Sequence, residues 1–123
     1  MSKMKNNKVE KKQIVRKWHL FDASMENFGR MCSKAALLLR GKNKVTFTPH
    51  IDAGDCVIFI NSDKLKFSKD KGKTKIYHHF SGYPGGIRSI SLGDQITKDS
   101  RVIIKKAIYG MLPNNKMRDQ IIK

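Results

Sequence analysis

The segment Cys-Val-Ile-Phe-Ile at 56–60 is apolar at every position and lies between two turn-like pairs, Gly54-Asp55 and Asn61-Ser62. A strand with one face in solvent alternates apolar and polar residues, because successive side chains point to opposite faces. Since this segment does not alternate, we predict a strand buried on both faces, as parallel strands are. Parallel strands need a crossover connection, usually a helix, which constrains the residues before this segment.

A helix over 28–39 precedes that strand. Its apolar side chains recur at helical spacing, Asn27 suits the N-cap, and Gly41 suits the position just after the helix. Residues 14–21 predict an earlier strand with an aromatic end. The order strand, helix, buried strand predicts a βαβ unit with a right-handed crossover. The apolar positions of the helix are Phe28, Met31, Cys32, Ala35, Ala36 and Leu39.

The middle of the chain predicts two further pieces of strand. One covers roughly 75–80. The other is a short strand at Leu65 and Phe67, which leads into a lysine-rich turn whose centre at 70–72 suits a hairpin.

The last third of the chain predicts helices. Residues 91–98 suit a short helix, and Asp99 or Ser100 would cap a second helix over 101–112. Pro113 would end that helix, because proline cannot continue the hydrogen-bond pattern.

The length of 123 residues suits one domain. Residues 1–13 are almost without apolar side chains and predict a basic tail, either flexible or ordered by RNA, while 14–123 form a single α/β domain. The longest apolar runs, at 35–39 and 56–60, are far short of a membrane span, and no signal-peptide core follows the basic start. We therefore expect a soluble protein that is not exported.

The positive charge is concentrated in blocks. The formal net charge is +16, and the basic residues gather at 1–17, 40–44, 64–75 and 101–123, while the apolar segments between them are nearly neutral or acidic. A surface that serves only solubility mixes both signs, so single-sign blocks indicate binding to a polyphosphate backbone. A membrane surface is the alternative, since 100–112 has some amphipathic character, but that apolar face equally suits core packing.

Catalytic and metal-binding motifs are weak in this sequence. His50, Asp52, Asp55 and Cys56 lie close together, but their spacing matches no structural zinc motif, and aspartates that cap backbone amides in loops are commoner. In a strand, two successive histidines would point to opposite faces and not act as one catalytic pair. We predict no catalytic residue, no bound metal and no cofactor. The two cysteines, in apolar surroundings, are expected to be reduced thiols.

Three segments predict contacts with RNA. Residues 40–44 carry three cations, more than a helix dipole alone explains, and 64–75 carry six lysines around a probable turn. The loop His-His-Phe-Ser-Gly-Tyr-Pro-Gly-Gly-Ile-Arg at 78–88 combines rings able to stack on bases with glycines that let backbone amides approach phosphates. Arg88 then suits a bidentate phosphate contact.

Five motifs, in order, resemble one family. They are Trp-His-Leu-Phe-Asp-Ala with Phe-Gly-Arg, Leu-Arg-Gly-Lys-Asn-Lys with Thr-Pro-His-Ile-Asp-Ala-Gly-Asp, Asn-Ser-Asp-Lys, Tyr-His-His-Phe-Ser-Gly-Tyr-Pro-Gly-Gly-Ile, and Tyr-Gly-Met-Leu-Pro. From about residue 18 to 113 the chain closely resembles the ribosomal protein L13 family of the large subunit, in its bacterial type. After the last motif that family usually continues with a Gly-Arg pair and a longer tail, so we expect a shortened C-terminus here.

The resemblance implies a three-layer α/β/α fold around a mostly parallel four-stranded sheet. It also implies a non-catalytic protein of the large ribosomal subunit that binds large-subunit ribosomal RNA, helps early assembly and touches neighbouring large-subunit proteins, in cytoplasmic or organelle ribosomes. No membrane contact or homo-oligomer is expected, and an RNA-binding regulator or chaperone outside the ribosome is the alternative. Asp52 and Asp55 would organise loops. The predicted RNA-binding residues are Arg40, Lys42, Lys44, Thr48, His50, Lys69, Lys71, Lys73, Lys75, His78, His79, Tyr83, Gly85, Gly86, Arg88, Lys116 and Arg118.

Overall fold

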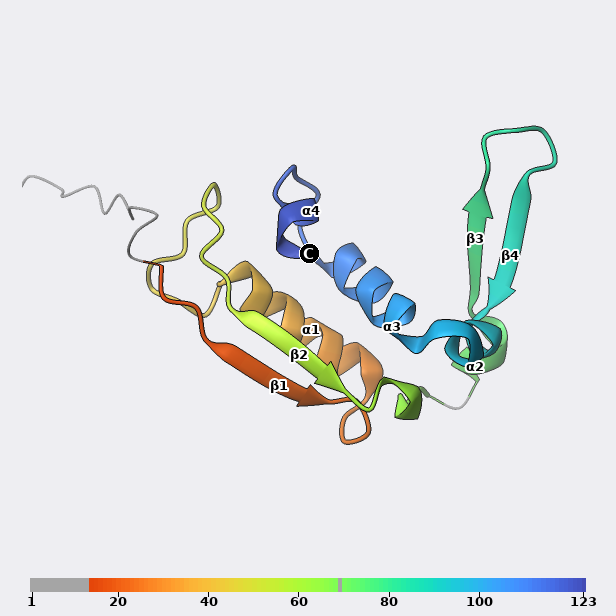
Figure 1. The fold of residues 1–123 in the computed structure, drawn as a ribbon, viewed down its shortest axis with the longest axis horizontal. Helices are drawn as coiled ribbons and strands as arrows, with labels where there is room; N and C mark the ends of the chain where they lie inside the picture. Colours follow the sequence, from red (N-terminus) through yellow and green to blue (C-terminus); the bar gives the residue numbers. More distant parts are fainter. Residues whose placement is uncertain (1–13, 69) are drawn as a thin grey trace, which may run out of the picture.

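A computed structural model describes residues 14–68 and 70–123 (Figure 1). The predicted tail at 1–13 and the predicted RNA contact Lys69 lie outside these residues. The elements follow the order β1 (Trp18–Asp22), α1 (Phe28–Arg40), β2 (Cys56–Ile60), the short 3₁₀ helix η2 (Ser62–Lys64), α2 (Lys71–Thr74), β3 (Ile76–Phe80), β4 (Ile87–Ser91), α3 (Leu92–Met111) and α4 (Arg118–Ile121). The predicted mixture of helices and strands is confirmed.

The predicted strand–helix–strand unit is present. β1 and β2 pair in parallel with Leu20 opposite Ile58, and α1 connects them. The helix ends as predicted at Gly41, whose φ of 74° is left-handed and whose N–H donates to Leu38 O at 3.0 Å. At its start, Asn27 makes no side-chain cap, and the Phe28 N–H donates instead to Lys66 O at 3.0 Å.

The hydrophobic core lies between α1 and α3. Met31, Cys32 and Ala35 of α1 are fully buried and belong to one cluster with Ile103 and Ile108 of α3. Phe21, Val57 and Phe59 of the strand pair pack against the same cluster. Both long helices therefore take their stability from one shared apolar interior.

The prediction of a four-stranded, mostly parallel sheet is wrong. In the described residues, the strands form two separate pairs, β1 with β2 in parallel and β3 with β4 antiparallel. Only residues 81–86 join β3 to β4, and a parallel pairing needs a crossover of about a dozen residues or more. The two strands must therefore pair with each other as an antiparallel hairpin, and in the described residues neither pairs with β1 or β2.

The predicted burial of 56–60 on both faces is also wrong, and the three-layer arrangement is not present in the described residues. One face of the β1–β2 pair remains open, with Trp18 72%, Leu20 66% and Ile58 43% exposed. The reason is that α3 packs against α1, on the face that α1 already covers, and not against the open face.

The lysine-rich segment also differs from expectation. Instead of a hairpin turn, residues Lys71–Thr74 form the one-turn helix α2, in which the Thr74 N–H donates to Asp70 O at 3.1 Å. Leu65 and Phe67 form no strand beyond one isolated bridge between Asn27 and Lys66, and they pack against the core.

The two helices predicted in the last third are confirmed as one kinked element. α3 contains a non-helical residue at Asp99, with φ −162° and ψ 104°, and the Asp99 carboxylate accepts the Arg101 N–H at 3.0 Å. Asp99 thus caps the second part, as predicted, and Pro113 follows the end of the helix. In the described part of the chain, no helix is both long and apolar enough to cross a membrane.

Candidate nucleic-acid interface

The predicted RNA-binding residues within the described chain fall into two groups, at opposite ends of α1 and α3 (Figure 1). At the C-terminal ends of both helices, a small cavity of about 40 Å³ lined by Phe47, Thr48, Asn115 and Met117 joins the loop after α1 to the segment after α3. The loop group is Arg40, Lys42, Lys44, Thr48, His50, Lys116 and Arg118. The hairpin group is Lys71, Lys73, Lys75, His78, His79, Tyr83, Gly85, Gly86 and Arg88.

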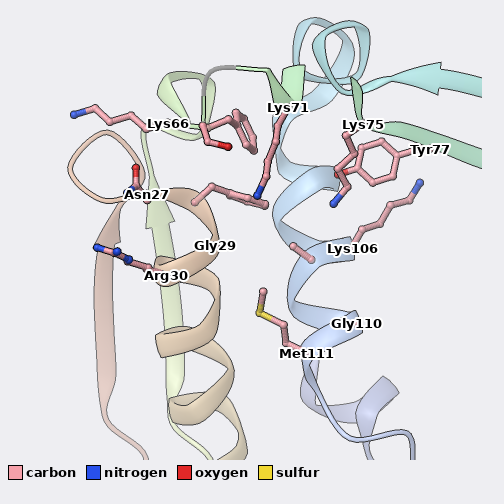
Figure 2. A pocket seen from close by; sticks show the side chains of 14 residues that line it. Asn27, Gly29, Arg30, Lys66, Lys71, Lys75, Tyr77, Lys106, Gly110 and Met111 are labelled. Atoms are coloured by element: carbon pink, nitrogen blue, oxygen red, sulfur yellow. The ribbon is translucent and has the colours of Figure 1, made fainter. Parts of the chain in front are cut away.

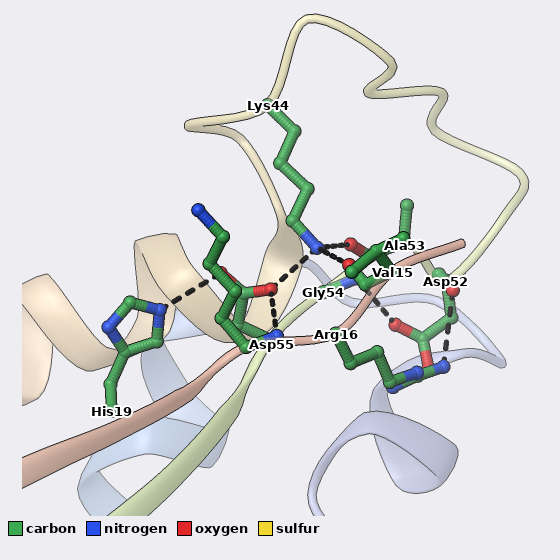
Figure 3. A network of polar contacts seen from close by, with 9 residues as sticks. Val15, Arg16, His19, Lys44, Asp52, Ala53, Gly54 and Asp55 are labelled. Carbon is green, nitrogen blue, oxygen red and sulfur yellow. Dashed lines mark hydrogen bonds and ion pairs between the residues drawn. The ribbon is translucent and has the colours of Figure 1, made fainter. Parts of the chain in front are cut away.

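Lys44 of the loop group is turned inward (Figure 3). Its ammonium donates to Val15 O and Ala53 O, both at 2.8 Å, and pairs with the Asp55 carboxylate. Its side chain is only 17% exposed. The charge of Lys44 is thus compensated inside the protein, and the residue holds the 41–55 loop against the start of β1.

Asp55 is the centre of this network. It is 3% exposed, and its carboxylate also accepts the Lys17 N–H at 3.1 Å and meets His19 Nε2 at 3.0 Å. Although burial opposes ionisation, the hydrogen bonds from Lys44, the Lys17 amide and His19 together hold the pKa of Asp55 well below its usual range. The Asp55 carboxylate is therefore ionised, and it binds Lys44, the Lys17 N–H and His19 inside the protein.

Asp52 plays a similar part at the edge of the loop. Its carboxylate accepts the Gly54 N–H at 3.2 Å and pairs with Arg16 at 3.0 Å (Figure 3). The prediction that Asp52 and Asp55 organise loops is confirmed. Within the described residues, no three His, Cys, Asp or Glu side chains gather in a way that could hold a metal ion.

Two arginines of the loop group lie on aromatic rings. The Arg40 guanidinium lies 5.3 Å from the Phe47 ring centroid, and that of Arg118 lies 3.8 Å from the Tyr109 centroid while donating to the Tyr109 hydroxyl at 3.0 Å. Such stacking fixes the plane of a guanidinium. Lys42, His50 and Lys116 are exposed.

The β3–β4 hairpin carries most of the hairpin group, and in Figure 1 it projects away from the rest of the molecule. His79 lies opposite Arg88, and His78 lies opposite Ser89, whose Oγ is 2.8 Å from His78 Nδ1. The two histidines therefore occupy opposite faces, as predicted. Phe80, Tyr83 and Ile87 are mostly exposed. A hairpin with so little of its own apolar surface buried is suited to contact a partner.

The glycines of the hairpin loop do two different jobs. Gly82 and Gly85 have φ values of 89° and 72°, which the turn requires and which glycine adopts without strain. Gly86 has no such conformation, but a Cβ there would lie 1.9 Å from Ser81 Oγ. Its N–H is donated to Tyr83 O at 2.9 Å, so this amide closes the loop.

A groove of about 540 Å³ lies beside the hairpin group, between the first turn of α1 and the second half of α3 (Figure 2). Phe28, Phe67, Ala107 and Met111 give it an apolar floor. Lys75 and Lys106 lie 5.4 and 5.0 Å from the centroid of the Tyr77 ring, which lines one wall. The charged residues that line the groove are all cations: Arg30, Lys66, Lys71, Lys75 and Lys106.

The sequence reasoning named Tyr77 as a ring able to stack on nucleotides, but it missed Arg30, Lys66 and Lys106 as members of the same site. Arg30 had the pattern of a solvent-facing helix position, and Lys106 belonged only to a general basic block. They come together because α3 packs beside α1 and residues 66–68, 71 and 75 line the same groove. The signal in the sequence was the position of Lys106 one helical turn before Gly110, which places both on one helix face.

Known proteins resemble this chain over most of its length. A family model described as "Ribosomal protein L13" matches residues 16–123. The large ribosomal subunit protein uL13 of Wigglesworthia glossinidia brevipalpis is 46% identical over 114 residues, which are 92% of this chain and 80% of that protein. The uL13 proteins of Geobacter sulfurreducens and Mycolicibacterium smegmatis are 44% and 49% identical, covering 98% and 89% of this chain and 85% and 74% of their own lengths.

Proposed function

The chain belongs to the ribosomal protein L13 family, in its bacterial type, and on that premise we propose that it binds large-subunit ribosomal RNA through the hairpin group and the exposed part of the loop group. Its role is that of a structural constituent of the large ribosomal subunit, not of an enzyme. The observation that carries the RNA-binding proposal is a set of exposed cations without internal partners. Six exposed cations of these groups form no salt bridge with any described residue: Lys42, Lys71, Lys73, Lys75, Arg88 and Lys116.

The chemistry of binding is multivalent neutralisation of phosphates. Each lysine or arginine that meets a phosphate releases condensed counterions, so affinity falls steeply as salt rises. The hairpin adds contacts of another kind, since the exposed rings of His79 and Tyr83 can stack on unpaired bases. Arg88, opposite His79 on the same hairpin face, suits a bidentate phosphate contact.

The internal network supports this surface without belonging to it. Lys44 and Asp55 fix the base of the 41–55 loop, which carries Lys42 and His50 at its exposed side. Since a rigid loop loses less conformational entropy on binding, Lys44 favours RNA binding by positioning other residues.

The proposal extends to assembly and neighbours. A protein that bridges RNA segments from two ends of one rigid helical core can bring these segments together early in the assembly of the subunit. The lysine-rich residues 1–13 would add a further RNA-reaching arm to the 14–123 domain. We place the protein in cytoplasmic ribosomes, next to other large-subunit proteins, as a single copy without a homo-oligomer.

Sucrose-gradient sedimentation at moderately high salt tests the proposal. The protein should migrate with large subunits and their precursors. A double variant of the hairpin group, Lys73→Glu with Arg88→Glu, should move toward the top of the gradient, whereas Lys98→Glu, an exposed position of α3 outside both groups, should not. Wild-type protein confined to the top fractions would overturn the proposal and favour an RNA-binding role outside the ribosome.

A further inference from the structure

Gly29 of α1 and Gly110 of α3 are among the residues that line the groove (Figure 2), and the fold gives no reason for glycine at either position. Neither has a positive φ, and a Cβ built on either would have no heavy atom within 4 Å apart from those of its chain neighbours and the adjacent backbone of its own helix. Glycine is one of the least favourable residues inside a helix. Two helical glycines that neither the backbone nor the packing requires therefore leave the groove free of side chains at these two positions.

The space that they keep open is amphipathic. Phe28 and Phe67, with ring centroids 4.9 Å apart, form the apolar floor with Met111. In Figure 2 the side chain of Lys71 extends into the space between the helices, and the ammonium of Lys75 lies at α3 beside the Tyr77 ring. Among the described residues, the cations that line the groove form no salt bridge. Two carboxylates adjoin the lining residues along the chain. That of Glu26 is paired with Lys34 at 2.6 Å, and that of Asp70 is exposed, does not line the groove and, among the described residues, forms no salt bridge.

We propose that this groove holds one unpaired nucleotide of the bound RNA, with its base on the apolar floor between Gly29 and Gly110 and its phosphate on Lys71 and Lys75. This inference rests on the proposed function and names the RNA element that this part of the surface takes. A nucleotide combines a flat, largely apolar base with an anionic phosphate, which matches the floor and the cations. The groove volume of about 540 Å³ lies within the range of small-molecule pockets.

Duplex RNA does not fit the same description. Its base faces are stacked on one another, so a duplex offers phosphates and sugars to the lysines and leaves the apolar floor empty. The groove should therefore prefer single-stranded over paired RNA, a preference that the exposed lysines of the loop group do not impose.

Filling the groove tests the proposal. Gly110→Leu adds a good helix former where a Cβ is unobstructed, so the variant should fold, as circular dichroism and a melting curve would verify. Binding is measured by fluorescence anisotropy at low salt with two labelled probes, an oligouridylate of about ten nucleotides and a blunt RNA duplex of similar length. Thr97→Leu, at an exposed position of α3 outside the groove, is the control because it adds the same side chain and keeps the charge.

We expect Gly110→Leu to weaken oligouridylate binding by about ten-fold, as for the loss of one stacked base, and to change duplex binding by less than about two-fold. Gly29→Leu should act in the same way from α1, and Thr97→Leu should leave both affinities unchanged. Single-strand affinity that survives in both groove variants would overturn the proposal, as would an equal loss for both probes, which would make the groove a phosphate site only. In both cases the proposed function would stand, whereas wild-type protein that binds neither probe would overturn both.

Discussion

Replacing Lys44 with methionine separates stability from RNA binding within one basic loop. Methionine keeps the apolar stem of the side chain and removes the ammonium. The change leaves the carbonyl oxygens of Val15 and Ala53 without their donor and takes from the buried Asp55 carboxylate its cationic partner. We expect the protein to lose stability, although Lys44 belongs to a segment whose charge predicts RNA contacts.

The size of the loss follows from the geometry. Removing one partner of a fully buried ion pair costs about 3–5 kcal/mol. Here Asp55 keeps its hydrogen bonds to the Lys17 amide and to His19, and water can reach the network through the 17% of the Lys44 side chain that is exposed. We therefore expect the lower part of the range, about 2–3 kcal/mol. For a domain of this size that amounts to a fall of about 10 °C in melting temperature.

Urea unfolding and a salt titration of RNA affinity form the assay, with Lys42→Met as the matched control. Lys42 lies in the same loop, is exposed and, in the described residues, has no carboxylate partner. Lys42→Met should leave the unfolding midpoint unchanged and lower the slope of log affinity against log salt by about 0.7–0.9, one phosphate contact. Lys44→Met should lower the unfolding midpoint and leave the slope of log affinity against log salt unchanged. If the free energies of unfolding of the Lys44→Met and Lys42→Met variants differ by less than about 0.5 kcal/mol, the network contributes no stability and the prediction is wrong.

Three further predictions concern the same scaffold. The pKa of Asp55 in the folded state lies below its unfolded value of about 3.9, so its contribution to stability is complete above about pH 5 and is lost as the pH falls further. Asp55→Asn should therefore flatten the acid limb of a curve of unfolding free energy against pH. An unchanged acid limb would mean that other groups cause the loss of stability in acid. Gly41→Ala should lower the free energy of unfolding by about 1–3 kcal/mol, because φ is 74° and the new Cβ would lie 2.9 Å from Ala53 O. Gly72→Ala is the control: its Cβ has open space, so in the same urea experiment it should be neutral or stabilising. Burial raises the pKa of Cys32 to about 11, so iodoacetamide in mildly alkaline buffer should modify the half-buried Cys56 first; mass spectrometry that finds Cys32 modified as fast would show that α1 opens readily.

The elements that local chemistry determines were predictable from the sequence. The apolar spacing of 28–39 and the glycine after it describe α1 and its left-handed end, and Asp99 marks the kink of α3 because an aspartate can cap a new helical turn. The parallel pairing of β1 and β2 followed from the helix between them. Each of these predictions used neighbours within a few turns of chain.

What failed depended on which surfaces meet. An unbroken apolar strand is compatible with burial on two faces, but α3 packs on α1 and leaves Ile58 exposed. The residues of β3 do not indicate which strand pairs with them; the six-residue connection between β3 and β4 makes β4 the partner. The groove escaped prediction for the same reason, since Gly29, Lys71 and Gly110 are distant in sequence and unremarkable one by one.

A basic block in this chain is not a list of phosphate contacts, because the fold uses some of its cations internally. In 40–44, the half-buried Lys44 is compensated by the buried Asp55 carboxylate, while Lys42 pairs with no carboxylate of the described residues. A compensated cation releases few counterions when RNA binds, since its field is already cancelled at short range. The salt dependence of RNA affinity should therefore follow the number of exposed cations without a carboxylate partner. The total charge is the poorer guide to the interface, and the acidic residues that position its loops are the better one.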